Sequence, residues 1–142
     1  MTTRGRFISL EGVDGAGKST LMKVMAGLVE PDQGLRVVPP GISVGYMEQD
    51  PDLSGFETLG AFAASALPEG ESYKVDVVAE GLKFRPETPV ATASGGERRR
   101  AALAKLLAEA PELMLLDEPT NHLDIQAIEW LETELRDTRT AF

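Results

Sequence analysis

Residues 94–124, SGGERRRAALAKLLAEAPELMLLDEPTNHLD, combine a helical pattern, an apolar run and a pair of carboxylates. The part from 95 to 110 is rich in alanine and leucine, which predicts a helix. Residues 113–116 are all apolar, which is typical of a strand buried in a parallel sheet. Asp117 and Glu118 follow that strand directly, so we expect them at the carboxyl edge of the sheet, where α/β proteins bind ligands. The stretch therefore predicts an α/β fold with a site beyond this strand.

A glycine-rich loop precedes it at residues 11–20, EGVDGAGKST, which fit the phosphate-binding pattern G-x-x-x-x-G-K-[ST]. An apolar strand is predicted before it at 7–10 and a helix after it at 18–28. Glycines let backbone N–H groups converge on an anion, and a helix N-terminus adds positive potential. The plain alternative is a glycine turn with an exposed lysine. The predicted nucleotide-binding residues are Gly12, Asp14, Gly15, Ala16, Gly17, Lys18, Ser19 and Thr20.

In this loop Lys18 would reach the terminal phosphates, and the Ser19 hydroxyl would join a Mg²⁺ ion. A carboxylate at Asp117 can hold the same ion directly or through water. Glu118 would then polarise the attacking water as a general base. The alternative for this acidic pair is an exposed strand end before a proline turn.

The remaining pattern predicts further strands and helices in alternation, which indicates a three-layer α/β domain. Strands are expected at 35–38 and 42–46, and helices at 56–66, 72–83 and 124–135.

The bulk composition sets limits on function. The chain has 142 residues, about one domain, and no cysteine, which excludes disulfides and thiolate zinc sites. Its net charge of −9 argues against strong nucleic-acid binding by this domain alone. The basic cluster 98–100 is interpreted as a solvated helical turn, with an RNA or protein contact as the alternative. No stretch predicts a signal peptide or a membrane span, so a cytoplasmic location without membrane insertion is expected.

Residues 94–124 resemble the ABC ATPase family, in the order signature sequence, helix, Walker B strand and D-loop. The ending DEPTNHLD followed by IQAIEWLE is similar to the ABC-F subfamily, whose members carry paired ATPase domains and no membrane domain. The resemblance runs from about residue 12 to residue 142. It implies a P-loop NTPase three-layer sandwich with a mainly parallel sheet. It also implies that 1–142 form a single partial ABC-type nucleotide-binding domain with a small helical subdomain at about 52–110.

The resemblance also assigns roles. ATP and Mg²⁺ are the implied cofactors, and Gln49 in GISVGYMEQDP matches the Q-loop, which senses Mg²⁺ and water. Ser94, Gly95 and Gly96 of the signature would face the γ-phosphate bound by a second ABC ATPase domain, in the same or another chain. Full-length relatives act on the ribosome, so the ribosome is an implied partner.

Three residues have a structural interpretation as well. Ser94 with Glu97 forms a capping box pattern, which is compatible with the signature role. Asp124 is expected to cap the last helix, and by resemblance it also lies at the interface between paired domains. Trp130 is predicted to be core. His122, the only histidine, lies in the D-loop and is not the family's switch histidine.

The start and the end depart from the family pattern. Residues 4–20 resemble the opening of a thymidylate kinase, but no Asp-Arg pair follows as that family requires. The adenine-stacking aromatic and the switch histidine have no match, and position 93 is alanine instead of leucine. The chain is therefore expected to be truncated at both ends, as a fragment or a hybrid. Two alternatives to a paired ATPase stay open: a thymidylate-kinase-like nucleoside monophosphate kinase, and a nucleotide-binding module without turnover. The isolated chain is expected to be weak or inactive as an ATPase.

Overall fold

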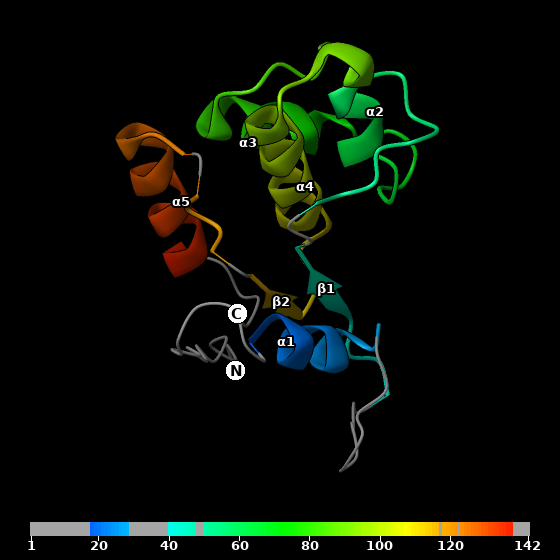
Figure 1. Ribbon diagram of the computed structural model, residues 1–142, viewed down its shortest axis with the longest axis vertical. Helices are drawn as coiled ribbons and strands as arrows, with labels where there is room; N and C mark the ends of the chain where they lie inside the picture. The colour runs from blue at the N-terminus through cyan, green and yellow to red at the C-terminus, as the bar shows by residue number, and fades with distance from the viewer. Residues whose placement is uncertain (1–17, 29–39, 48–49, 117, 122, 138–142) are drawn as a thin grey trace.

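The computed structural model describes residues 18–28, 40–47, 50–116, 118–121 and 123–137 (Figure 1). The predicted strands at 7–10 and 35–38 lie outside these residues. In chain order the elements are α1 (Lys18–Ala26), β1 (Val44–Tyr46), α2 (Leu59–Ala63), α3 (Tyr73–Leu82), the 3₁₀ turn η1 (Val90–Thr92), α4 (Gly95–Glu109), β2 (Leu113–Leu115) and α5 (Ile125–Asp137).

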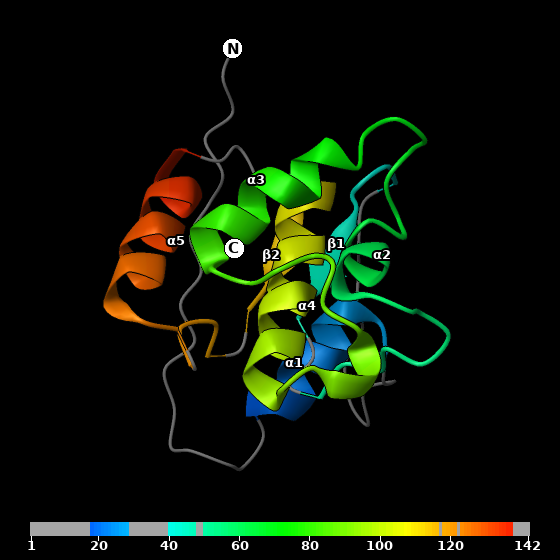
Figure 2. The ribbon, with the colours of Figure 1, turned by 90° about the horizontal axis from the view of Figure 1, so that it is seen from above.

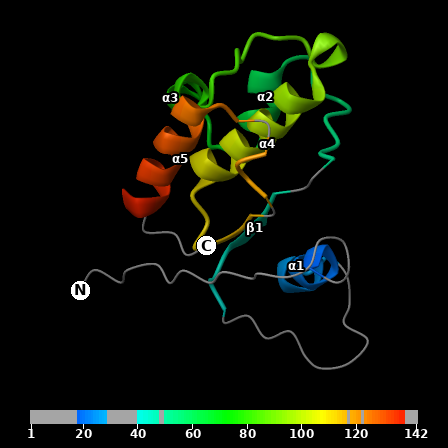
Figure 3. The same ribbon diagram turned by 60° about the vertical axis from the view of Figure 1, so that its left-hand side comes forward.

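The two described strands form a parallel pair, with Gly45 opposite Met114. Hydrogen bonds between Ser43 and Glu112 hold this register just before the two strands begin. The carboxylate of Glu112 accepts from Ser43 N at 2.6 Å and from Ser43 Oγ at 3.0 Å, and Glu112 N donates to Ser43 Oγ at 3.1 Å. Helices α1 and α4 lie on opposite sides of β1 (Figures 1 and 3). The α/β class with a parallel sheet is thus confirmed.

Helices α2, α3 and α4 pack together above the strands, with α4 in the middle (Figure 2). Their contact is apolar: Leu59, Leu82 and Leu103 are at most 1% exposed. The helices predicted at 72–83 and 95–110 and the strand predicted at 113–116 correspond to α3, α4 and β2, and their bounds are correct to within one or two residues. The helical subdomain at about 52–110 stays a prediction.

Helix α2 is shorter than the predicted helix at 56–66. Residues 57 and 58, near the start of the predicted helix, pair with residues 89 and 90 instead. Glu57 O accepts from Val90 N at 2.9 Å, and Thr58 forms an antiparallel bridge with Pro89. Thr58 is therefore extended, and its hydroxyl accepts from Ala61 N at 3.1 Å as the helix cap. Tertiary pairing thus overrides the local helical pattern.

Helix α1 ends at Ala26, two residues before the predicted end. Gly27 follows with a φ of 81°, a conformation that glycine adopts readily and that ends helices. Leu28 consequently lies outside the helix and is 57% exposed, whereas Met22 is buried.

Helix α5 packs against α3, and its Leu131 is buried in the core. The indole ring of Trp130 lies directly over Gly81, where a Cβ atom would come within 2.1 Å of Cε2. Trp130 packs on the core, as predicted. Across the described residues, no helix combines the length and the apolar character needed to cross a membrane.

Candidate nucleotide site

The predicted phosphate loop is described only from its helical end. Lys18, Ser19 and Thr20 form the first turn of α1, so the helix begins directly after the glycines, as predicted. Gly12, Asp14, Gly15, Ala16 and Gly17 lie outside the described residues, as do Gln49, Asp117 and His122. Among the described residues there is no group of three or more histidine, cysteine, aspartate or glutamate side chains that could hold a metal ion. The Mg²⁺ ligands Ser19, Gln49 and Asp117 therefore stay predictions.

Glu118 lies just beyond the end of β2 in an unusual backbone conformation. Its φ is 48°, which for a residue with a side chain costs about 1–2 kcal/mol and often marks functional sites. The carboxylate is exposed, and its Oε2 accepts from Asn121 Nδ2 at 3.1 Å. Asn121 N also donates to the Glu118 carbonyl at 3.1 Å. One carboxylate oxygen therefore has a hydrogen-bond partner within the described part of the chain.

Asn121 was not singled out from the sequence. The sequence signal for this contact is an amide side chain three residues after Glu118, with Pro119 between them, which favours a tight turn.

The first turn of α4 carries the signature residues. Ser94 is extended, with φ −70° and ψ 163°, and its Oγ accepts from Glu97 N at 3.2 Å. Ser94 is thus the N-cap, as the capping pattern predicts. No return bond from Ser94 N to the Glu97 carboxylate is present among the described contacts. A Cβ on Gly95 would meet nothing within 4 Å, so the space beside this helix N-terminus is open to an anion.

The basic cluster that follows is half-buried, which corrects the prediction of a solvated turn. Arg98 Nη2 donates to Val90 O at 3.0 Å and so ties η1 to α4. Arg99 Nη2 lies 4.0 Å from Asp50 Oδ1. The Nε atoms of Arg98 and Arg100 are buried and have no hydrogen-bond partner among the residues that the structure describes. The arginine side chains are thus partly covered by other segments of the chain, which the charge pattern alone does not reveal.

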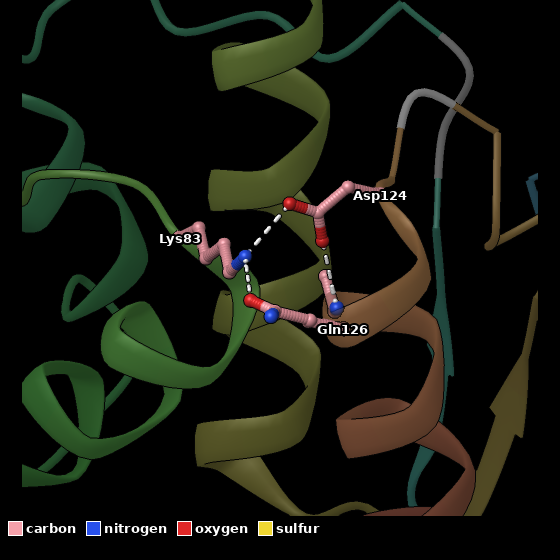
Figure 4. A network of polar contacts seen from close by, with 4 residues as sticks. Lys83, Asp124 and Gln126 are labelled. Carbon is pink, nitrogen blue, oxygen red and sulfur yellow. Dashed lines mark hydrogen bonds and ion pairs between the residues drawn. The ribbon is translucent and has the colours of Figure 1, made fainter.

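Asp124 makes two polar contacts at the start of α5. Its Oδ1 accepts from Ala127 N at 2.8 Å, so it caps the helix as predicted, and its Oδ2 accepts from Lys83 Nζ at 2.8 Å (Figure 4). Lys83 also donates to Gln126 Oε1. The hydrogen bond from Lys83, followed by that from Ala127 N, holds the pKa of Asp124 below its usual value. The carboxylate at this position is therefore charged at neutral pH.

An open cavity of about 410 Å³ lies between the end of α3 and the start of α4. Its charged lining includes Lys83, Arg100, Glu80 and Glu97, so both signs are present. No nucleotide-binding residue predicted within the described part of the chain lines it.

The comparisons with known proteins identify the family. The family model described as ABC transporter matches residues 2–121. The chain belongs to the ABC transporter family. It is 47% identical over 133 residues to the ATP-binding protein Uup of Caulobacter vibrioides, an alignment that covers 93% of this chain and 21% of Uup. It is 34% identical, over an alignment of 172 residues, to the energy-dependent translational throttle protein EttA of Mycobacterium tuberculosis, which covers 92% of this chain and 31% of EttA.

Solved structures agree on the fold of this ABC domain. The ATP-binding subunit of an ABC transporter superposes with a TM-score of 0.81 at 26% identity, over 96% of this chain and 65% of that chain. The complex of the archaeal ribosomal stalk protein aP1 with the ribosome recycling factor aABCE1 gives a TM-score of 0.74 at 25% identity, over 97% and 28%.

The family assignment decides between the two resemblances in the sequence. Uup and EttA are ABC-F proteins, so the ABC-F resemblance is confirmed. The thymidylate kinase resemblance of residues 4–20 is unsupported, because the ABC transporter match includes this stretch. The chain spans about a fifth of the length of Uup and about a third of the length of EttA.

Proposed function

We propose that this ABC domain binds ATP with Mg²⁺ and hydrolyses ATP when it is paired with a second ABC ATPase domain. Closing and opening of the pair would be the physical output. The observation that carries the proposal is Glu118, an exposed carboxylate held by Asn121 just beyond β2 in a chain of the ABC family.

In this proposal the phosphate loop binds the nucleotide. Lys18 neutralises the terminal phosphates, and Ser19 with Asp117 and Gln49 holds Mg²⁺. The start of α1 at Lys18 supports it, because a helix N-terminus adjoins the glycines.

Glu118 acts as the general base. A base must present a free lone pair to the attacking water in a fixed direction. The bond from Asn121 restricts the carboxylate, and the left-handed backbone sets the direction in which it leaves the strand end. Strain of this kind is typical of a residue whose placement serves function.

The second domain completes the site. Ser94 and Gly95 are exposed at the N-terminus of α4, and the capped helix leaves room for an anion. The proposed ligand of this turn is the γ-phosphate of ATP bound by the partner domain. Hydrolysis therefore depends on pairing, since the water, the base and the signature must be aligned together.

The names of the relatives indicate the partner on which closing and opening of the paired domains would act. EttA is named a translational throttle protein, and one structural neighbour is a ribosome recycling factor in complex with a ribosomal stalk protein. We propose the ribosome as the partner of the protein to which this domain belongs. The net charge of −9 favours contacts through other parts of that protein over direct RNA binding by this domain.

Pairing and turnover are tested with Glu118→Gln, which keeps the shape of the side chain and removes the base. ATP should bind to this variant and persist, so sedimentation should show an ATP-dependent rise in dimer. Adding Ser94→Arg should abolish that rise, whereas Ser72→Arg, at the N-cap of α3, should leave it intact. A monomer at every ATP concentration would contradict pairing through the signature. Binding without hydrolysis by the unmodified chain at dimer-forming concentrations would instead favour a nucleotide-binding module without turnover.

A further inference from the structure

Lys83 occupies a position at which a glycine is expected. It follows the last residue of α3 with φ 59° and ψ 52°, in the left-handed region. Lys83 N donates to Ala79 O, and Phe84 N donates to the same carbonyl at 3.2 Å, which is the pattern of a helix end that favours glycine. A lysine here destabilises the backbone relative to glycine.

The ion pair of the Lys83 side chain does not compensate for this destabilisation of the backbone. Its ammonium group bonds Asp124 at 2.8 Å, but the two side chains are 43% and 54% exposed. An ion pair in water contributes little net free energy, because solvent screens the charges and both side chains lose freedom. The lysine therefore needs another explanation.

The contact connects two parts of the chain that are 41 residues apart in sequence. Asp124 lies just after the turn that begins at Glu118, and its other oxygen caps α5. Within that turn, Asn121 N bonds Glu118 O and Leu123 N bonds Thr120 O, both at 3.1 Å. Lys83 thus holds the residue that follows the turn carrying the proposed base.

Helix α3, which ends directly before Lys83, packs along α4, which begins with the signature. The close contact of Gly81 with Trp130 is a second point of attachment between α3 and α5. We propose that Lys83 is a positioning residue: it ties the end of α3 to Asp124, just after the turn that begins at Glu118, and so keeps Glu118 aligned with α4, the helix that begins with the signature. The inference rests on the proposed ATPase function.

The test compares Lys83→Gly with Ala110→Gly. Ala110 ends α4 in the same left-handed conformation, with φ 47° and ψ 60°, so both variants relieve the same backbone penalty. Only Lys83→Gly removes the link to Asp124. Lys74→Met is a second control, because Lys74 forms an exposed ion pair with Glu71 within one turn at 2.9 Å.

Hydrogen exchange and steady-state kinetics give the readouts. Both glycine variants should raise the melting temperature. Lys83→Gly alone should increase exchange at the amides of Asn121, Leu123 and Ala127 by about fivefold. It should also lower kcat for ATP by about fivefold with KM unchanged, since only the alignment of the base is lost. Lys83→Arg, which keeps a cation of similar reach, should restore both.

Equal exchange in the two glycine variants would overturn the proposal. Faster exchange in Lys83→Gly with an unchanged kcat would also overturn it, because the link would then be only structural. If the unmodified chain, at concentrations at which it is paired, does not hydrolyse ATP above the level of Glu118→Gln, the proposed function fails. The exchange measurement still tests the link in that case.

Discussion

Gly81→Ala places a methyl group into the contact between α3 and α5. The new Cβ atom would lie 2.1 Å from Cε2, 2.2 Å from Cδ2 and 2.6 Å from Cζ2 of Trp130. These atoms belong to the middle of the indole ring, so a small rotation of the side chain does not clear the clash. Either the ring leaves its place over α3, or the two helices move apart.

Two effects of opposite sign decide the outcome. Replacing glycine by alanine inside a helix stabilises it by about 1 kcal/mol. Overpacking a close contact typically destabilises by about 1–3 kcal/mol, and a clash this short belongs at the upper end. The difference predicts a net loss of about 1–2 kcal/mol in the free energy of unfolding.

Urea unfolding measures this directly, because Trp130 is the only tryptophan and its fluorescence reports on the contact. Gly95→Ala is the matched control: it lies in the first turn of α4, with nothing within 4 Å of the added Cβ, so it should leave stability unchanged or raise it by up to about 1 kcal/mol. A Gly81→Ala chain that is as stable as the unmodified chain or more so, with unchanged Trp130 emission, would refute the packing described for α3 and α5.

Two further predictions concern Asn121 and Asp124, which lie between β2 and α5. Asn121→Ala removes the donor to Glu118 and should lower kcat about tenfold while ATP affinity stays constant; steady-state kinetics and calorimetry check this, and an unchanged kcat contradicts the role. The pKa of Asp124 is lowered first by Lys83 and then by Ala127 N, so its contribution to stability is present above about pH 4 and is lost as pH falls through the lower folded value. Carbon NMR titration of the Asp124 carboxyl should show a higher pKa in Lys83→Met, and an identical pKa would contradict the contact.

Local sequence patterns predicted a helix or strand correctly where its tertiary contacts favour the same structure as its own residues do. The alanine- and leucine-rich helix at 95–110 and the apolar strand at 113–116 both form, because helix propensity and burial favour the same result there. Helix α2 is shorter than its pattern, because the pairing of Thr58 with Pro89 lies outside any local window.

Contacts between distant residues were not predictable from the pattern of the sequence. Ser94 and Asp124 cap their helices as expected, since a cap is a local motif. Lys83 was missed because its partner is 41 residues away and its backbone is that of a glycine. The half-buried state of Arg98 likewise depends on Val90 of the preceding loop. The roles proposed for the phosphate loop and for Gln49 and Asp117 stay predictions, as does the cytoplasmic location.

Calorimetric titration with ATP and Mg²⁺ tests the central claim most directly. Lys18→Ala should weaken binding at least tenfold, which corresponds to about 1.4 kcal/mol for a charge-assisted contact with phosphate. Lys23→Ala, an exposed lysine on the same helix α1, is the control and should leave the affinity unchanged. Equal affinities of the unmodified chain and Lys18→Ala for ATP would contradict the account, because the loop before α1 would then not be the nucleotide site.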